Sequence, residues 1–526
     1  MRKGQCIGHA NFEQVQRAVK DFRLGAPLNA SGATISAECL QSLFAALASD
    51  DSEMQASPLG SIHKPAFPGE VSFEKANFVG VADFAHAVFK GPAYFDGATF
   101  DDRADFRQVE FQDHADFDEA AFKNGVNFRG AIFNDHAGFE RMLAAQDKAV
   151  FIAARFRSYV DFEQASFCNG LDMTGVTFQL ARRLGPLDVC GSFVLDNCVF
   201  AERVSIDAIA NRLSATSAVF ADGARLGFGG GDIQMKGVDF GRATTLSRYQ
   251  APDTPNEKQA RRPRLLSLYG AQVASLSLSG INVEACRFFG AHGLESMIIE
   301  PSCKWRHTPP HRRCIDREIL LEEEEWRLQD ERKRHARRRL TRHHQKSPWA
   351  RHSASNETGD AGAAEYTPLE PNQLAALYRA LRKAREENKD QAGAGDLYYG
   401  EMEMRRRSEL PVGRGRIRAF CDKLIITAYW LLSGYGLKAS RAFAFWCSLI
   451  VIASFAITRW GLNPSLPFPR SLAFTAESTS GHLRIAAIPR GYELNGVGEG
   501  IRACLRILGP VLIGLWLLAL RNRVKR

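Results

Sequence analysis

The sequence has little of what marks a secreted or a catalytic protein. Its 11 cysteines include no CxxC pair, and no apolar segment follows the opening Met1–Cys6. We therefore expect neither a disulfide framework nor a cleavable signal peptide, and we place the bulk of the chain in a reducing cytoplasm. No Ser/His/Asp set, carboxylate pair or GxGxxG strand–turn–helix stands out. The sequence thus predicts no enzymatic activity and no cofactor.

Tyrosine and tryptophan are also scarce, with 11 and 7 residues against 35 phenylalanines. From position 73 the phenylalanines are separated by alternating steps of five and six residues, and a small apolar residue precedes most of them by two positions. Positions i−2 and i of an extended chain point to the same side, whereas steps of five and six wander around a helix. The predicted ladder of inward-facing residues is Phe73, Phe78, Phe84, Phe89, Phe95, Phe100, Phe106, Phe111, Phe117, Phe122, Phe128, Phe133, Phe139, Phe151, Phe156, Phe162 and Phe167.

Four such short strands occupy 22 residues. We expect coils of this length to stack phenylalanine on phenylalanine at about the 4.8 Å spacing of paired strands. The pattern weakens after Phe167, is interrupted by a polar loop at 250–264, and resumes from Leu268 to Phe288 with a plain period of five. Each coil would bury its apolar side chains on its neighbours, so no coil could fold alone.

This pattern resembles the Phe-rich form of the pentapeptide-repeat family over about 65–300. The resemblance implies a right-handed, four-sided parallel β-helix, which we assign to 67–300. The predicted fold class is therefore mainly β, with flanking α-helices and a C-terminal α-helical transmembrane hairpin. We expect 1–66 to form a helical cap over the first coil, since an open coil end invites edge pairing. A β-sandwich with accidental periodicity is the disfavoured alternative.

The charge of the repeat bears on its partners. Some pentapeptide-repeat proteins resemble a DNA rod and inhibit type II topoisomerases, which requires a strongly acidic face. Here the stretch 67–249 has 25 acidic and 18 basic residues, and its arginines argue against such mimicry. A nucleic-acid partner is therefore disfavoured. The outward faces of the β-helix are predicted to bind a protein partner that the sequence does not identify.

One motif after the repeat contains possible metal ligands. The candidate zinc ligands are Cys303, His307, His311 and Cys314. Two thiols and two imidazoles form a donor set that tetrahedral zinc accepts. However, Pro309 and Pro310 lie between these ligands, and the spacing matches no zinc finger. We interpret the segment as a basic loop and commit to no metal.

The segment 301–352 is basic, and from Cys314 to His344 it predicts one long charged helix. Its acidic residues lead and its basic residues trail, as the helix dipole favours. The apolar positions are too sparse to form a core-facing stripe. We interpret the helix as a solvated strut, and binding of anionic lipid headgroups is the functional alternative.

A helical hairpin is expected at 372–410, after a linker at 353–371. Residues Asn388–Asp390 and Gly393–Asp396 are predicted to break the helical pattern between its two arms. The stretch 377–406 resembles the TPR-like hairpin that precedes the membrane segments of many bacterial pentapeptide-repeat membrane proteins.

The last part of the chain, 411–526, contains the long apolar runs. We predict transmembrane helices at about 441–460 and 503–520. The shorter run 424–437 is predicted to lie in the membrane interface. The residues predicted to flank the membrane are Arg441, Trp460, Arg506 and Arg521.

Basic residues precede the first of these spans and follow the second. This distribution places both termini in the cytoplasm and a short loop outside. With the resemblance, it predicts a protein of the bacterial inner (cytoplasmic) membrane, whose first partner is the lipid bilayer. Assembly into a homo-oligomer stays open.

The loop between the spans raises an alternative function. Some pentapeptide-repeat membrane proteins resemble two-span ion channels, with a pore helix and a Thr-x-Gly-Tyr-Gly filter. Residues Leu472–Ser480 could form a vestigial pore helix, but no filter follows them, and Ser433–Gly436 precedes the first span. We therefore predict a non-catalytic, membrane-anchored scaffold. A degenerate channel or transport component is the alternative, and a DNA-mimicking topoisomerase inhibitor is less favoured.

Overall fold

The computed structural model describes residues 20–22, 27–48, 66–250, 261–309, 316–337, 369–408, 416–463, 467–480 and 493–524. These residues form two compact units, with the boundary between Glu325 and Trp326. The first unit consists mainly of short strands and the second of helices.

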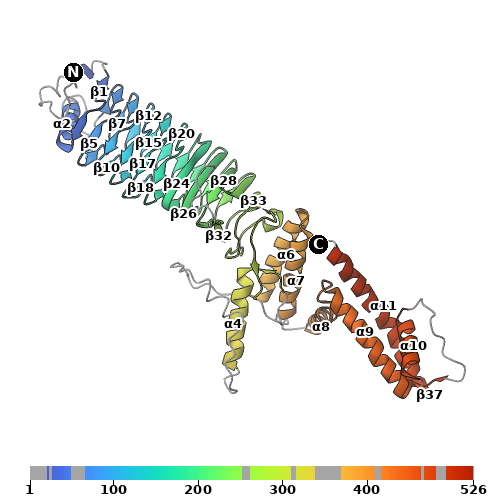
Figure 1. Ribbon diagram of the computed structural model, residues 1–526. Helices are drawn as coiled ribbons and strands as arrows, with labels where there is room; N and C mark the ends of the chain where they lie inside the picture. Colours follow the sequence, from blue (N-terminus) through green and yellow to red (C-terminus); the bar gives the residue numbers. More distant parts are fainter. Residues whose placement is uncertain are drawn as a thin grey trace. The chain divides into compact units, whose positions relative to one another are not determined.

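The first unit is a parallel β-solenoid of about ten turns (Figure 1). Most of its strands have two residues, and the chain returns to the same ladder with every fourth strand. One ladder, for example, joins β4 (Val71–Ser72), β8 (Ala93–Tyr94), β12 (Ala115–Asp116) and β16 (Ala137–Gly138) in parallel register. The stacked-coil fold predicted from the phenylalanine spacing is confirmed. The winding hand and the four-sided cross-section stay predictions of the resemblance.

The core of the solenoid is a set of phenylalanine stacks. Every predicted ladder phenylalanine is buried, with no more than 1% of its surface exposed. In the longest stack, the ring centroids of Phe67 and Phe89 are 4.5 Å apart and those of Phe89 and Phe111 are 4.9 Å apart, with nearly parallel rings. This spacing equals the spacing of paired strands, because each ring belongs to the next coil of the same ladder. The stack continues to Phe240.

The fraying of the sequence pattern has a structural counterpart in coil length. Phe111 pairs with Phe133 across 22 residues, Phe133 with Phe156 across 23, and Phe200 with Phe220 across 20. The extra residue lies within 145–148, since the register is 22 before this corner and 23 after it. Corners therefore absorb length changes that the strands do not.

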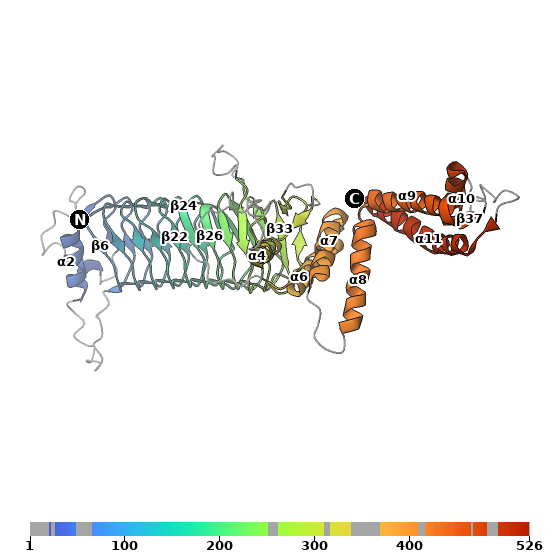
Figure 2. The ribbon, with the colours of Figure 1, turned by 90° about the horizontal axis from the view of Figure 1, so that it is seen from below.

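The solenoid begins earlier than the sequence indicated. Within the segment expected to form only a helical cap, β1 (Leu28–Asn29) pairs with β4, and β2 (Thr34–Ser36) pairs with β5 (Asn77–Val79). Helix α2 (Ala37–Ala48) follows and lies at the end of the stack in both ribbon views (Figures 1 and 2). Its Phe44 contacts the ring of Phe67 edge-on at 5.8 Å between centroids. The helix thus covers apolar rings of the first coil.

Helix α4 (Leu321–Arg337) begins later than the helix expected from Cys314 to His344. Its start differs because the preceding strand β36 (Glu318–Ile319) pairs antiparallel with β35 (Arg306–His307). Residues 310–315 and 338–344 lie outside the described part of the chain.

In the second unit, α6 (Pro371–Glu387) and α7 (Gln391–Arg407) form the expected hairpin. The chain turns at Lys389, whose φ is 61°, and Asp390 caps α7 by accepting a hydrogen bond from the Gly393 amide at 3.0 Å. Residues Gly393–Asp396 do not break the helix, contrary to the prediction. A Cβ on Gly393 would lie 1.4 Å from Nη1 of Arg385, so this glycine permits the close approach of the two helices.

Four more helices lie in the described residues of this unit after α7. They are α8 (Arg416–Ser433), α9 (Ala439–Ala456) with a π-helical turn to Gly461, α10 (Phe468–Ser480) and α11 (Gly496–Val524). Figure 2 shows α9, α10 and α11 side by side. Two helical stretches, Ala439–Gly461 and Gly496–Arg521, are long and apolar enough to cross a membrane.

Candidate functional site

The helices α9 and α11 are apolar on the outside. The large side chains that they expose are, on α9, Phe443, Val451, Ile452 and Phe455 and, on α11, Ile507, Leu508, Val511, Leu517, Leu518 and Leu520. Ile452 and Ile507 are 67% and 69% exposed. A water-soluble helix usually turns such residues toward the core. Here the apolar surface faces outward, as it does on a helix in lipid.

Hydroxyl groups fill the interior between α9 and α10. Ser471 of α10 lies 2.7 Å from the hydroxyl of Ser454 and 2.7 Å from that of Thr458. Thr475 donates to the Ser471 carbonyl at 2.9 Å, and Ser454, Ser471 and Thr475 have no exposed surface. Small hydroxyl residues let helices approach closely, and their hydroxyl groups form hydrogen bonds with one another. This packing is typical of membrane helix bundles.

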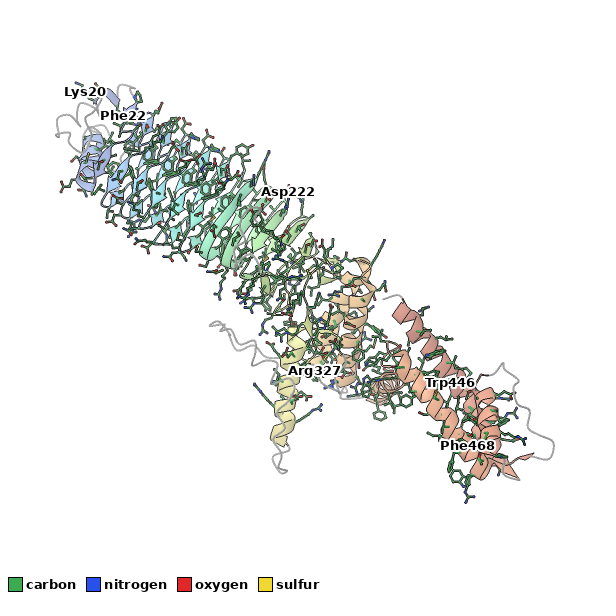
Figure 3. All side chains as sticks on the ribbon, viewed as in Figure 1. Lys20, Phe22, Asp222, Arg327, Trp446 and Phe468 are labelled. Atoms are coloured by element: carbon green, nitrogen blue, oxygen red, sulfur yellow. The ribbon has the colours of Figure 1, made fainter. Side chains whose placement is uncertain are left out.

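Helix α10 also approaches α11 closely. A Cβ on Gly509 would lie 2.4 Å from the carbonyl oxygen of Thr479. The predicted vestigial pore helix, Leu472–Ser480, is therefore helical and packs against both apolar helices. The residues 481–492 that follow it lie outside the described residues. Figure 3 labels Phe468, at the start of α10, and Trp446 on α9.

The predicted membrane-flanking residues occupy different environments. Arg506 and Arg521 are exposed on α11, and Trp460 is 59% exposed in the π-helical turn. The Arg441 guanidinium carbon lies 5.8 Å from the centroid of the Trp430 ring. Residues Ser433–Gly436, whose sequence is similar to a channel filter, lie in the turn between α8 and α9.

This turn has an unusual backbone. Gly434, Tyr435 and Gly436 have φ values of 56°, 60° and 73°. Such a run needs glycine at two of its three positions, because left-handed backbone is costly for other residues. The Tyr435 side chain is buried, and its hydroxyl donates to Glu403 at 3.3 Å. The turn is thereby fixed to the hairpin.

Two buried glutamates at the end of α7 each form ion pairs with several arginines. Glu401, 1% exposed, lies within 2.6 to 3.1 Å of its partners Arg379, Arg382 and Arg405. Each buried carboxylate is thus surrounded by more positive charge than it neutralises. Removal of one partner of such a buried ion pair is strongly destabilising.

Glu403 has the same arrangement. It bonds with Arg406 and Arg407, both at 2.9 Å, and Arg327 of α4 (labelled in Figure 3) lies 3.9 Å away. Burial raises the pKa of Glu403, but Arg407 and Arg406 outweigh this effect and hold the pKa below its usual value. Arg406 also stacks on Trp430, with its guanidinium carbon 4.3 Å from the ring centroid.

The glutamates that open α4 were expected in solvent but are buried at the end of the solenoid. Glu323 forms a two-point ion pair with Arg317 at 2.6 and 2.7 Å, and Glu324 pairs with Arg306. Sequence reasoning missed these pairs because the arginine partners precede the glutamates at irregular distances. The charged start of α4 is therefore part of the fold.

Glu322 differs from its neighbours because it bonds to backbone. Its carboxylate accepts hydrogen bonds from the amides of Phe288 and Phe289 at 2.7 and 3.1 Å. Burial raises the pKa of Glu322 to about 6. The helix is thus joined to the last coils of the solenoid through an acid that titrates near neutral pH.

Two of the four candidate zinc ligands fall in the described residues. Cys303 is buried, with its thiol 3.4 Å from the carbonyl of Leu278, whereas His307 is exposed and lies 3.2 Å from Asp316. His311 and Cys314 lie outside those residues. Within the part of the chain that the structure describes, no group of three or more His, Cys, Asp or Glu residues could hold a metal ion.

A column of carboxylates marks one outer face of the solenoid. Asp96, Asp118, Glu140 and Glu163 each follow a stacked phenylalanine in consecutive coils. Burial raises the pKa of Asp118 to about 6, and the nearby carboxylates add to the shift against a hydrogen bond from the Glu140 amide. The column repeats at the coil spacing and forms a regular acidic edge.

Comparison with known proteins identifies the repeat. The family model for pentapeptide repeats (nine copies) matches 64–110 and 95–143. No curated protein and no solved structure gives a significant match to the chain. The matched residues are those whose coils stack most regularly, and the same ladders continue beyond them to Ile299. The stretch 64–143 of the solenoid is therefore similar to pentapeptide repeats.

Proposed function

We propose that this chain is a non-catalytic scaffold that α9 and α11 anchor in a membrane, with the solenoid as its binding domain. The observation that carries the proposal is the apolar outer surface of α9 and α11, whose large side chains stay exposed although α10 packs against both helices. Exposing so many apolar side chains to water would be unfavourable, whereas lipid accommodates them.

The charge distribution supports an orientation. Lys438 and Arg441 lie at the start of α9, and Arg521 lies near the end of α11. Positive residues are retained on the cytoplasmic side of a bilayer. We place the solenoid and both termini in the cytoplasm of a bacterium, with the α9–α11 connection outside.

A double substitution on the lipid-facing side of α9 tests the anchor. Val451→Lys with Ile452→Lys alters two exposed residues, so it would be harmless if α9 were the surface of a soluble domain. In a bilayer the double substitution places two charges near the middle of a span. The full-length double variant should therefore leave the membrane pellet in alkaline carbonate. The matched control is Ser440→Lys at the exposed start of the helix. Retention of the double variant in the pellet would overturn the proposal.

A channel is the second candidate, and the packing of α10 between α9 and α11 favours it. The test is ion flux from liposomes that contain full-length protein or a variant lacking Leu472–Ser480. Flux that disappears with the deletion would make this a channel with the solenoid as its cytoplasmic domain. Absence of flux from correctly inserted protein would leave the scaffold function.

A further inference from the structure

Two helices of the second unit bring basic groups to a tryptophan on a third helix. Trp430 of α8 is fixed by a hydrogen bond from its indole nitrogen to the Tyr399 hydroxyl at 3.0 Å. Arg406 of α7 and Arg441 of α9 both lie over its ring, at 4.3 and 5.8 Å from the centroid. Arginine gains from the face of an indole ring, so the ring holds both guanidinium groups near one place.

Lys438 brings a further positive charge to the same turn. A Cβ on Gly434 would lie 3.4 Å from the Lys438 side chain and 3.8 Å from a guanidinium nitrogen of Arg441. Both side chains are half-buried. Burial lowers the pKa of Lys438, and the charge of Arg441 lowers it further. The two cations therefore repel each other across a glycine that has no side chain to separate them.

The nearby acid does not compensate this pair. Glu403 bonds with Arg406 and Arg407, and among the described residues no carboxylate lies within 4.0 Å of Lys438 or Arg441. Helix α9 begins here without a side-chain cap. Like charges held together in a partly dry place are unfavourable unless an anion lies between them.

The position of this cation pair identifies the anion. It lies at the first turn of α9, where the apolar surface that would meet lipid begins, next to a tryptophan of the kind that lies at headgroup level. Basic pockets beside transmembrane helices on the cytoplasmic side bind the headgroups of anionic lipids. We propose that Lys438 and Arg441, with Trp430 and Arg406 positioning them, bind the phosphate of an anionic phospholipid. This inference rests on the proposed membrane anchor.

The test measures thermal stability of full-length protein in neutral detergent. Added phosphatidylglycerol should raise the melting temperature, whereas phosphatidylcholine and inorganic phosphate should not. Lys438→Gln with Arg441→Gln should weaken the response to phosphatidylglycerol about thirtyfold in lipid concentration, since each basic residue near an anionic lipid surface contributes about fivefold in affinity. The matched control is Arg459→Gln with Arg470→Gln, which removes two exposed arginines elsewhere in the same unit.

Each other outcome overturns the inference. An unchanged response in the Lys438/Arg441 variant would show that the lipid binds elsewhere. An equal loss in the control variant would show general attraction to positive charge, and an equal response to inorganic phosphate would show a free-anion site. Carbonate extraction of the Lys438/Arg441 variant separates this question from the anchor: the variant should stay in the membrane pellet.

Discussion

Among single residues, Phe111 shows how the solenoid core depends on one side chain per strand. It has no exposed surface and stacks on Phe89 at 4.9 Å and Phe133 at 5.0 Å. Phe111→Asp would bury a charge between two rings and should destabilise the solenoid by more than about 3 kcal/mol. Circular dichroism of the full-length variant should show loss of the strand signal and an early melting transition. Gln112→Asp, at the exposed neighbour, should melt like the parent protein, and unchanged melting of both variants would refute the stacked core.

Glu322 predicts a dependence on pH. Its folded pKa is about 6, raised by burial above the ordinary value of 4.5. The folded chain therefore retains a proton that the unfolded chain releases, so the stabilising contribution is complete below about pH 4.5 and is lost as the pH rises through about 6. Glu322→Gln keeps an acceptor for the two amides and removes the charge.

The Glu322→Gln protein should therefore melt above the parent at pH 8, with a gap of about 2 kcal/mol in unfolding free energy that narrows to less than about half by pH 5. Melting of both full-length proteins at pH 5, 6, 7 and 8 measures this. The pairs Arg317–Glu323 and Arg306–Glu324 are present in both and cancel in the comparison. A gap that does not change with pH would show that Glu322 is not the titrating group.

At the scale of elements, the α6–α7 hairpin depends on two glycines. A Cβ on Gly393 would collide with Arg385, and one on Gly400 would lie 2.6 Å from the Tyr378 ring. Alanine normally stabilises a helix interior by up to about 1 kcal/mol over glycine. Here Gly400→Ala should instead lower the melting temperature, because Tyr378 is fully buried and has no room to move. Gly514→Ala on α11, where the Cβ position is open, is the control and should be neutral or stabilising.

The elements also show what the sequence could predict. The strand ladders were predictable because each strand repeats the same small and large residue, so the period itself specifies the pairing. The helix start at Leu321 was not, because it depends on contacts between α4 glutamates and the distant Arg306 and Arg317. The sequence pattern predicted a helix break at Gly393 and predicted no role for Gly400. A glycine that permits a close contact looks the same in sequence as one that permits a turn.

Across the whole molecule, the two units differ in the kind of side chain that they expose. The solenoid buries phenylalanine and exposes charge, whereas α9 and α11 expose isoleucine, leucine and valine around an interior that combines apolar side chains such as Ile457 and Leu505 with the hydroxyls of Ser454 and Ser471. Hydropathy indicated the two long apolar helices from sequence alone. Hydropathy did not indicate the cluster of arginines and glutamates that precedes these helices. The charged residues of this cluster form ion pairs at sequence separations that follow no regular period.

The 22-residue coil length in the regular part of the solenoid has a consequence for how this molecule can change size. Ala93, Ala115 and Ala137 occupy one ladder at steps of 22 residues. Removal of 115–136 would therefore place Ala137 where Ala115 was and leave every later strand beside an equivalent neighbour, so the shortened chain should still melt cooperatively. Removal of Phe117 alone, which follows β12, would take out the ring that stacks between Phe95 and Phe139 and put every later residue of this coil one position out of register. In this architecture whole coils are interchangeable units, and a single residue can be gained or lost only at a corner.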